Sequence, residues 1–365
     1  MKLTDYLTSA YQVLDVKASR IMGLTPRGPL IVFLSLTERC NLRCKKCTIW
    51  KSEKEAREAE LNKEEIFSLL SQLSSMGTKI IALWGGEPLL NKNLCEIIRE
   101  IHCLKMIPYL ITNGLLLNEQ NVAQLIKSGL GSISVSLDNP FPEKHDERKG
   151  VKGAFARTCE GLALLKKMNG DKVNVGINMV ISKDNIQEIL PMAELASSLK
   201  LNWLKFIPVH FGFPYNQMEF GDKELMPDEE ETDSIQRNLF EARKYLVGQG
   251  LYTNSTKFLK EFQGFFKGEY PMKHCYAGYL LCNVDSYGNA TQCSLDSRSA
   301  GNIRKSSFKE LWKSTEFDHI RKDHNEELCG HCWLSCFAEP SFRMSFFYST
   351  RNLFQVLTEI SFIRG

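Results

Sequence analysis

Three cysteines lie close together near the start of the chain, in the sequence Cys40-Asn-Leu-Arg-Cys44-Lys-Lys-Cys47. Three thiolates at this spacing can hold one face of a cubane iron–sulfur cluster and leave the fourth iron open to a further ligand. Zinc is the alternative, because closely spaced cysteines also bind zinc, but this segment offers only three ligands and no neighbouring histidine. The triplet therefore favours an iron–sulfur site with one open iron.

A second group of cysteines lies late in the chain and consists of Cys275, Cys282, Cys293, Cys329, Cys332 and Cys336. The sequence shows no export signal, and thiols in a reducing compartment stay free for metal or redox chemistry. Four thiolates complete a [4Fe–4S] cluster without an open position, whereas a zinc ribbon is the alternative for this segment taken alone. The three remaining cysteines are expected to be small buried apolar side chains: Cys95, Cys103 and Cys159.

The elements that must position these cysteines alternate between short apolar runs and helical patterns from residue 29 to 209, as in βα units around a parallel sheet. Strands are expected at 30–36, 79–84, 107–112, 132–137, 173–181 and 203–209. Consecutive βα units of this kind predict an α/β fold, a partial (β/α)6 barrel of parallel strands. Functional residues are then expected at the carboxyl ends of the strands.

The expected helices have recognisable ends. Asn62 followed by Glu65 predicts a capping box, and Gly77 follows the last turn of that helix. Further helices are expected at 118–129, 154–170, 185–199, 228–247 and 258–266.

Polar motifs close three of the strands. Gly85-Gly86-Glu87-Pro88 follows the second, Thr112-Asn113-Gly114 closes the third and Ser136-Leu137-Asp138 closes the fourth. The glycines permit a close approach of backbone. With CxxxCxxC after the first strand, this arrangement resembles the radical S-adenosylmethionine (SAM) superfamily.

The resemblance implies that Cys40, Cys44 and Cys47 hold a [4Fe–4S] cluster whose open iron binds SAM. Reductive cleavage of SAM would then give a 5′-deoxyadenosyl radical that abstracts hydrogen from a substrate. The residues implied in SAM binding, with Glu87 receiving the SAM amino group, are Gly85, Gly86, Glu87, Pro88, Asn113, Ser136 and Asp138. The fifth strand lacks the second glycine and the glutamate of the family's adenine-binding segment, and Lys46 stands where the family usually has an aromatic residue.

The late cysteines resemble the auxiliary-cluster domain called SPASM, or its shortened twitch form. The resemblance implies one auxiliary [4Fe–4S] cluster on Cys275, Cys293, Cys329 and Cys332, with Cys282 and Cys336 as substitutes or core thiols. With four ligands assigned, electron transfer is expected, which favours oxidation or bond formation. Epimerisation, which needs a thiol or tyrosine hydrogen donor, stays open, and the hydrogen donor and catalytic acid or base are not identified.

The expected organisation has five parts: an N-terminal helical segment (1–28), the barrel (29–210), a helical connection (211–270), a cysteine-rich auxiliary-cluster domain (271–340) and an apolar C-terminal helix (341–365). The last part is rich in apolar and aromatic residues, with few charges. It either docks on the barrel or touches a membrane surface as an amphipathic helix.

Composition narrows the range of partners. The 365 residues carry 46 Lys plus Arg against 43 Asp plus Glu, a net charge of +3, which gives no electrostatic case for nucleic acid. No apolar run reaches the roughly 18 residues of a membrane span, and no signal peptide is visible, so a cytoplasmic enzyme is expected. The resemblance implies a reductant such as flavodoxin or ferredoxin.

The short segment before Cys40 favours a small-molecule substrate, with a ribosomal peptide or a lipid as alternatives. A non-enzymatic metal-cluster sensor or binding protein is the rival from another class. It predicts no SAM binding and no use for Glu87.

Overall fold

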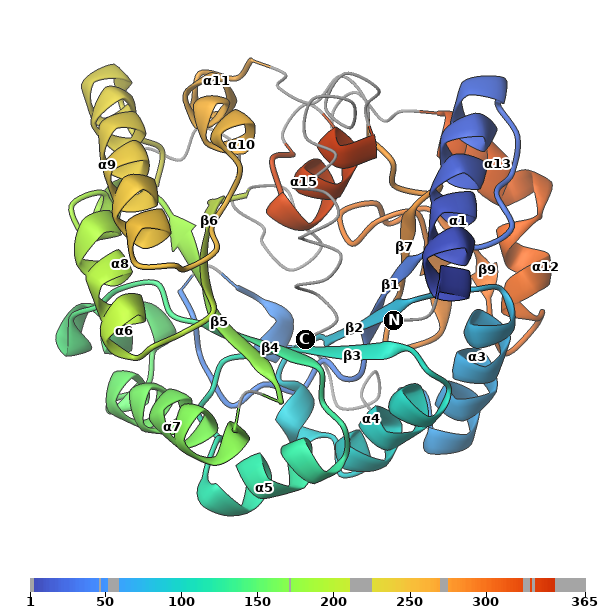
Figure 1. Ribbon diagram of the computed structural model, residues 1–365, viewed down its shortest axis with the longest axis horizontal. Coiled ribbons are helices and arrows are strands. Elements are labelled where there is room, and N and C mark those ends of the chain that lie inside the picture. The colour runs from blue at the N-terminus through green and yellow to red at the C-terminus, as the bar shows by residue number, and fades with distance from the viewer. Residues whose placement is uncertain are drawn as a thin grey trace.

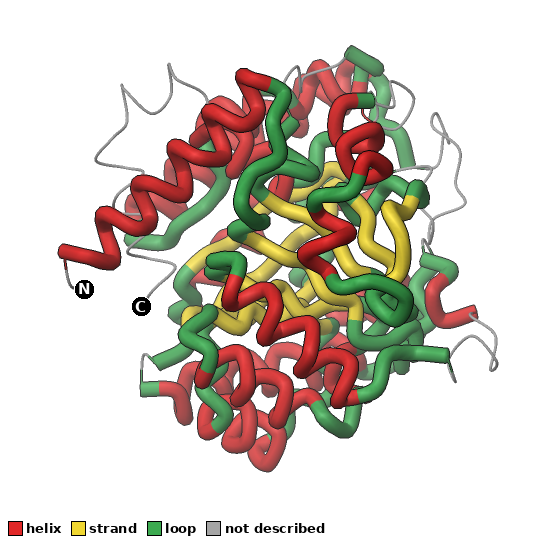
Figure 2. The backbone as a smooth tube through the Cα atoms, turned by 90° about the vertical axis from the view of Figure 1, so that its right-hand side faces the viewer, coloured by secondary structure: helices red, strands yellow, loops and turns green. Residues whose placement is uncertain are grey.

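The computed structural model describes residues 3–45, 47–51, 59–170, 172–210, 225–269, 275–323, 329 and 332–344. Six parallel strands form the curved inner wall of the molecule, and helices cover its outside (Figures 1 and 2). These strands are β1 (Ile31–Ser35), β2 (Ile80–Trp84), β3 (Ile107–Thr112), β4 (Ser132–Ser136), β5 (Asn174–Ile181) and β6 (Trp203–Pro208). Each expected strand agrees with an observed one to within one residue at either end, and the partial parallel barrel is confirmed.

Strands β1 and β2 are buried along most of their length, which is why they read as short, nearly continuous apolar runs. In β1, Val32 and Leu34 belong to the main core between the sheet and the outer helices, whereas Phe33 belongs to a second cluster inside the barrel. There Phe33 lies 5.5 Å, ring centroid to ring centroid, from Phe337 of α15 (Ser335–Met344). The late segment of the chain thus packs inside the barrel.

The outer helices are α3 (Lys63–Ser75), α4 (Leu94–Cys103), α5 (Glu119–Lys127), α6 (Pro142–Lys149), α7 (Ala154–Asn169) and α8 (Ile189–Ser198). The capping box of α3 is confirmed, because Asn62 Oδ1 accepts from the Glu65 amide and the Glu65 carboxylate accepts from the Asn62 amide. The helix expected at 185–199 starts later, since 183–185 form a separate 3₁₀ turn, η3 (Lys183–Asn185). Helix α6 was not expected, because its sequence PEKHDERK has no apolar stripe.

The cysteine-rich segment continues the barrel sheet. Strand β7 (Leu281–Val284) pairs in parallel with β1, and β8 (Asn289–Thr291) and β9 (Ser299–Asn302) follow in antiparallel pairing. The resulting order is β6-β5-β4-β3-β2-β1-β7-β8-β9. Strands β7 and β8 form a hairpin with its turn at residues 285–288, and Cys293 lies two residues beyond the return strand β8. Both cysteine groups therefore depend on the paired strands β1 and β7.

The remaining helices are α1 (Leu3–Met22), α9 (Glu229–Gly248), α10 (Thr256–Lys260), α11 (Phe262–Phe266), α12 (Phe308–Trp312) and α13 (Thr315–Lys322), with 3₁₀ turns η1 (Ile49–Lys51) and η2 (Pro88–Leu90). The single helix expected at 258–266 is instead two short helices that meet at Glu261. The C-terminal helix expected at 341–365 lies beyond Met344 outside the described residues, as does its membrane contact. Of the helices in the described part of the chain, none is both long and apolar enough to cross a membrane.

Candidate active site

The segment that leads into the early cysteines is held by backbone hydrogen bonds from Gly86 and Glu87, which follow β2. The Gly86 amide donates to the Thr37 carbonyl at 2.7 Å and the Glu87 amide donates to the Arg39 carbonyl at 2.8 Å. A Cβ on Gly85 would lie 2.3 Å from the Thr37 oxygen, and one on Gly86 would lie 2.3 Å from the Arg39 oxygen. Gly85 also has a φ of +137°, which a side chain would disfavour. The glycines therefore permit the backbone contact that leads into Cys40.

Glu87 is fully buried and connects the loop after β2 to the loop after β3. Its carboxylate accepts hydrogen bonds from the Leu89 amide (3.0 Å), the Thr112 hydroxyl (2.7 Å) and the Asn113 amide (2.8 Å). Burial raises the pKa of Glu87, and these three hydrogen bonds oppose that rise. The carboxylate thus acts as a tie between the loops after β2 and β3.

Asn113 connects this tie to the cysteine loop. Its side-chain Nδ2 donates to Asn41 Oδ1 at 2.8 Å and lies 4.0 Å from the Cys40 sulfur, at the outer limit of an N–H···S hydrogen bond. The motifs that close β2 and β3 therefore meet beside Cys40.

Helix α6 supports the other side of the cysteine loop. The Arg43 amide donates to the Lys149 carbonyl at 3.0 Å, and the Lys45 amide donates to the Arg148 carbonyl at 3.2 Å. Gly150 ends α6 in the left-handed region at φ +66°, and a Cβ there would lie 2.4 Å from the Arg43 oxygen. The loop therefore runs between the Gly85-Gly86 turn and the end of α6.

Asp138, at the end of β4, forms a buried ion pair with Lys149, Oδ2 to Nζ, at 2.7 Å. Asp138 Oδ1 also accepts from the Val180 amide at 2.9 Å. Although burial opposes it, the Lys149 ammonium holds the pKa of Asp138 well below its usual range. Lys149 has a raised pKa for the reciprocal reason, against the desolvation that lowers it.

The three early thiols are partly exposed and have raised pKa values. Burial raises the pKa of Cys40 to about 11, and it raises the pKa values of Cys44 and Cys47. The Lys149 ammonium opposes that rise at Cys44 and Cys47. Thiols of this kind become thiolates when a metal cluster supplies the compensating charge.

A repeated local geometry marks several cysteines of both groups. The amide two residues further along donates to the sulfur and lowers the thiol pKa, an arrangement that favours a thiolate ligand. The Ala277 amide, for example, lies 3.3 Å from the Cys275 sulfur. The cysteine and amide pairs are Cys40 with Leu42, Cys47 with Ile49, Cys275 with Ala277, Cys293 with Leu295, and Cys332 with Leu334.

The late thiols, with the exception of Cys282, lie close enough to Cys275 for it to raise their pKa values. Cys275 interacts with all four of the others, Cys293, Cys329, Cys332 and Cys336. Cys282, in contrast, lies in the main core on β7, where burial raises its pKa and Arg321 opposes that rise. Cys282 therefore lies apart from the other late thiols, whereas Cys336 lies near the expected ligands. Within the described ranges, no three Cys, His, Asp or Glu side chains converge tightly enough for a single metal ion.

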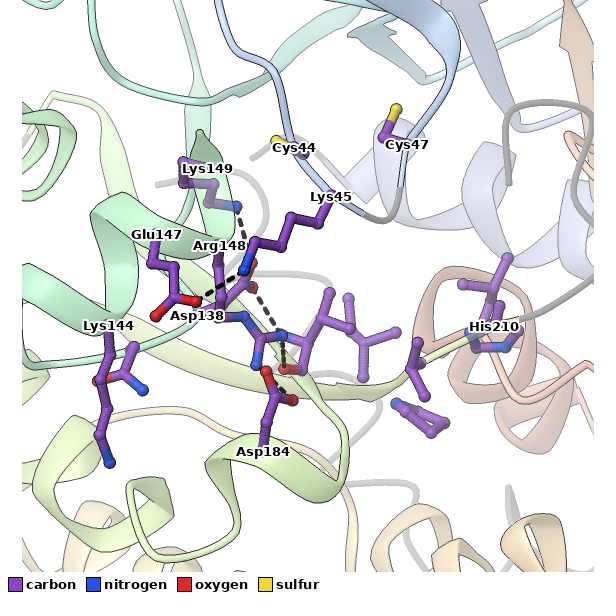
Figure 3. Close-up of a pocket in the computed structure, with 16 residues that line it drawn as sticks. Cys44, Lys45, Cys47, Asp138, Lys144, Glu147, Arg148, Lys149, Asp184 and His210 are labelled. Carbon is purple, nitrogen blue, oxygen red and sulfur yellow. Dashed lines mark hydrogen bonds and ion pairs between the residues drawn. The ribbon is translucent and has the colours of Figure 1, made fainter. Parts of the chain in front are cut away.

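A cavity of about 580 Å³ lies against the cysteine loop (Figure 3). Cys44 and Cys47 border one part of it, and Leu334, two residues after Cys332, borders another. One wall is charged, and the other is apolar and comes from β5, β6 and Leu334. Its lining residues are Cys44, Lys45, Cys47, Asp138, Asn139, Lys144, Glu147, Arg148, Lys149, Val180, Asp184, Ile207, Pro208, Val209, His210 and Leu334.

The charged wall is internally paired. Lys45 pairs with Glu147 at 2.7 Å, Arg148 pairs with Asp184 at 2.8 Å, and Lys144 pairs with Glu188. In Figure 3 the Lys45–Glu147 and Arg148–Asp184 pairs lie at one end of the cavity and His210 lies at the other. The wall therefore offers both charge signs to a ligand.

The structure places the expected site residues in different surroundings. Cys44, Cys47 and Asp138 line the cavity, and Cys40 and Asn113 contact each other beside it. The glycines and Glu87 lie behind the loop, Pro88 begins η2, and Ser136 ends β4.

Sequence reasoning missed the charged residues of α6 and also His210. The α6 residues carried a signal, since a charged run between two apolar runs, followed by a glycine, lies directly after the expected β4. His210 is a lone histidine after a strand, and nothing in its surrounding sequence distinguishes it.

Comparison with protein families gives two matches. Residues 34–196 match the model of the Radical SAM superfamily, and residues 275–333 match the model of an iron–sulfur cluster-binding domain, SPASM. The chain is also 30% identical, over 84% of its length and 88% of the relative, to an AdoMet-dependent heme synthase of Methanosarcina barkeri. The chain belongs to the radical SAM superfamily. It is an enzyme that uses SAM with a [4Fe–4S] cluster, and it has an auxiliary iron–sulfur cluster domain.

Other relatives differ in the activities that their names give. A PqqA peptide cyclase of Rhizobium meliloti is 29% identical over 83% of this chain and 79% of its own length. Among solved structures, Streptococcus suis SuiB bound to S-adenosylmethionine superposes with a TM-score of 0.67 at 17% identity, over 91% of this chain and 78% of that one. This last similarity supports the fold. Family membership thus establishes the class of chemistry, and the substrate is a separate question.

Proposed function

We propose that this radical SAM enzyme oxidises a small-molecule substrate in the cavity between its two cysteine groups. The observation that carries the proposal is that one cavity borders both Cys44 and Cys47 at one part and Leu334, beside Cys332, at another. Its volume of about 580 Å³ falls within the range of ordinary small-molecule sites.

Cys40, Cys44 and Cys47 would hold the SAM-binding cluster. Their number, partial exposure and sulfur-directed amides fit three corners of a cubane. When bound, the reduced cluster and SAM supply a 5′-deoxyadenosyl radical that abstracts a hydrogen atom from the substrate. Cluster and SAM therefore carry the difficult chemistry, and the barrel positions the reactants and excludes water.

Some strand-end residues would contact SAM directly, and others would hold the residues that contact it. Asn113, Ser136 and Asp138 lie at the carboxyl ends of β3 and β4, facing the side from which the cysteine loop approaches. Glu87, whose oxygens are already satisfied by protein donors, would act by fixing Asn113 and the loop, with Gly85, Gly86 and Pro88 shaping the turn.

Cys275, Cys293, Cys329 and Cys332 would hold the auxiliary cluster, with Cys336 as the substitute ligand. When bound, this cluster would supply a one-electron acceptor for the substrate radical, whose oxidation would also release a proton to solvent. An external one-electron carrier such as a flavodoxin or ferredoxin would supply the electron for SAM cleavage.

Maturation of a peptide is the second candidate function. The similarity to a PqqA peptide cyclase favours it. A charged cavity wall, with the exposed Lys45–Glu147 pair, could also contact a peptide that enters from solvent.

The test uses anaerobically reconstituted enzyme, SAM and dithionite, and measures 5′-deoxyadenosine. A small-molecule ultrafiltrate of a cell extract is expected to raise the yield several-fold over SAM alone, while the retained peptide and protein fraction is not. A rise with the retained fraction alone would overturn the small-molecule proposal in favour of peptide maturation.

The electron-transfer role of the auxiliary cluster is tested in the same assay. The double variant Cys275→Ala/Cys293→Ala is expected to lose about half of the iron and to keep SAM cleavage, but to form no oxidised product. Retention of full iron content would contradict the assignment of these ligands.

A further inference from the structure

His210 lies at the junction of the cavity and the late cysteine segment. It follows β6 (Trp203–Pro208) after one residue, lines the cavity and is 7% exposed. Its Nε2 accepts a hydrogen bond from the backbone amide of Trp333 at 2.9 Å. Trp333 directly follows Cys332, so a side chain just beyond the last strand of the barrel holds the backbone next to a proposed cluster ligand.

The imidazole is itself fixed on two sides. The Pro208 carbonyl accepts a hydrogen bond from it, and its ring packs against Phe265 with 5.3 Å between the centroids. Burial lowers the pKa of His210 to about 3. Because Nε2 accepts a hydrogen bond from the Trp333 amide, the ring is neutral, the form in which one nitrogen donates and the other accepts.

The segment that His210 holds is short and tightly anchored. The Trp333 indole Nε1 donates to the Phe258 carbonyl at 3.0 Å, and its ring stacks on Phe258 at 5.1 Å. The next residue, Leu334, lines the cavity and directs its amide at the Cys332 sulfur. Three consecutive residues thus provide a ligand, an anchored backbone and a part of the cavity wall.

We propose that His210 is a positioning residue that fixes Cys332 and the Leu334 amide and thereby sets the reduction potential of the auxiliary cluster. The proposal rests on the proposed function, which assigns Cys332 as a ligand. Amide hydrogen bonds to cluster sulfurs favour the reduced, more negative state and raise the potential. Without the acceptor at His210, the Trp333 amide is unpaired, the segment relaxes and the hydrogen bond to Cys332 weakens.

The test measures the auxiliary cluster alone, in a protein whose Cys40, Cys44 and Cys47 are all replaced by Ala. After anaerobic reconstitution, iron content is determined and the cluster is titrated electrochemically with detection by electron paramagnetic resonance. His210→Phe keeps a ring against Phe265 but has no acceptor, whereas His210→Gln restores an acceptor. Phe265→Leu is the matched control, because it loosens the packing around His210 and leaves the hydrogen bond to Trp333.

The expected result is a more negative midpoint potential and an altered resonance signal for His210→Phe, with values close to the parent for His210→Gln and Phe265→Leu. An unchanged potential in His210→Phe overturns the proposal, and so does an equal shift in all three variants, which would report general packing. If His210→Phe does not fold, His210→Leu replaces it as the variant without an acceptor.

The test also separates the two proposals. A triple-Ala parent that takes up no iron would overturn the auxiliary ligand assignment, and the role of His210 with it. A parent that holds about four irons and has a potential insensitive to the His210 variants would overturn the role of His210 alone.

Discussion

Replacement of Glu87 by Gln tests how the cysteine loop is held. One carboxylate oxygen accepts from the Leu89 amide and the Thr112 hydroxyl, and the other accepts from the Asn113 amide. An amide side chain has one acceptor oxygen, so its NH2 group must face at least one of these donors. Glu87→Gln therefore loses at least one charge-assisted hydrogen bond at a fully buried position.

The number of lost hydrogen bonds sets the expected loss in the free energy of unfolding. A hydrogen bond to a charged group contributes about 1.5–3 kcal/mol, and the remaining bonds lose their charge assistance. We expect the free energy of unfolding to fall by about 2–3 kcal/mol. At about 2 °C per kcal/mol, the scaling for the larger domains, Tm falls by about 4–6 °C.

The assay is thermal unfolding in the background where Cys40, Cys44 and Cys47 are Ala, so that neither cluster nor SAM contributes at the loop. Glu194→Gln, on the exposed face of α8, is the matched control and is expected to leave Tm unchanged. A Glu87→Gln variant that unfolds at the temperature of its parent would contradict the role of the Glu87 carboxylate as a tie between the loops after β2 and β3.

Three further predictions concern the supports of the site. Asp138→Asn leaves the Lys149 ammonium buried without its partner and is expected to cost about 3–5 kcal/mol in denaturant unfolding, whereas Lys45→Gln, which breaks an exposed pair, costs less than about 1 kcal/mol. The pKa of Asp138 is depressed in the folded state, so its carboxylate contributes fully to the free energy of unfolding above the unfolded pKa of about 3.9. That contribution is lost as the pH falls further. The stability of Asp138→Asn should therefore depend less steeply on pH than that of the parent below about pH 4. Gly86→Ala forces a Cβ to within 2.3 Å of a backbone oxygen and should halve the iron content by emptying the early site, and full iron loading would contradict the role of that close backbone contact. Cys282→Ala should keep all of the iron and lose only stability, about 1–3 kcal/mol, and a loss of iron would return this thiol to the ligand set.

The barrel could be predicted from sequence because short runs rich in apolar residues alternate with helical patterns. The run Ile107–Thr112, for example, is largely apolar up to Thr112 and is followed by Asn113-Gly114, so its bounds were predicted correctly. Helix α6 was missed, since only His145 and Lys149 of its residues are buried and they leave no apolar periodicity. This helix is held by ion pairs and by backbone contacts to a neighbouring loop, so its sequence signal is a charged run that ends at Gly150 rather than an apolar stripe.

Long-range pairings were also beyond the sequence. The register that places Ile31 beside Leu281 joins two segments far apart in the chain, and neither segment specifies its partner. For the same reason the sequence could not show that Cys282, on β7, lies within the main core and apart from the other late cysteines. Residue type and spacing predicted the chemistry, and the three-dimensional contacts identified which side chains support it.

Cys40, Cys44 and Cys47 are proposed to hold the cluster at which SAM is cleaved. The direct measurement is 5′-deoxyadenosine formed under anaerobic conditions by protein reconstituted with iron and sulfide, given SAM and dithionite, beside the variant in which all three cysteines are Ala. This ligand assignment predicts that the parent forms 5′-deoxyadenosine and that the variant forms none while keeping the iron of the auxiliary site. Equal amounts of 5′-deoxyadenosine from parent and variant would contradict it.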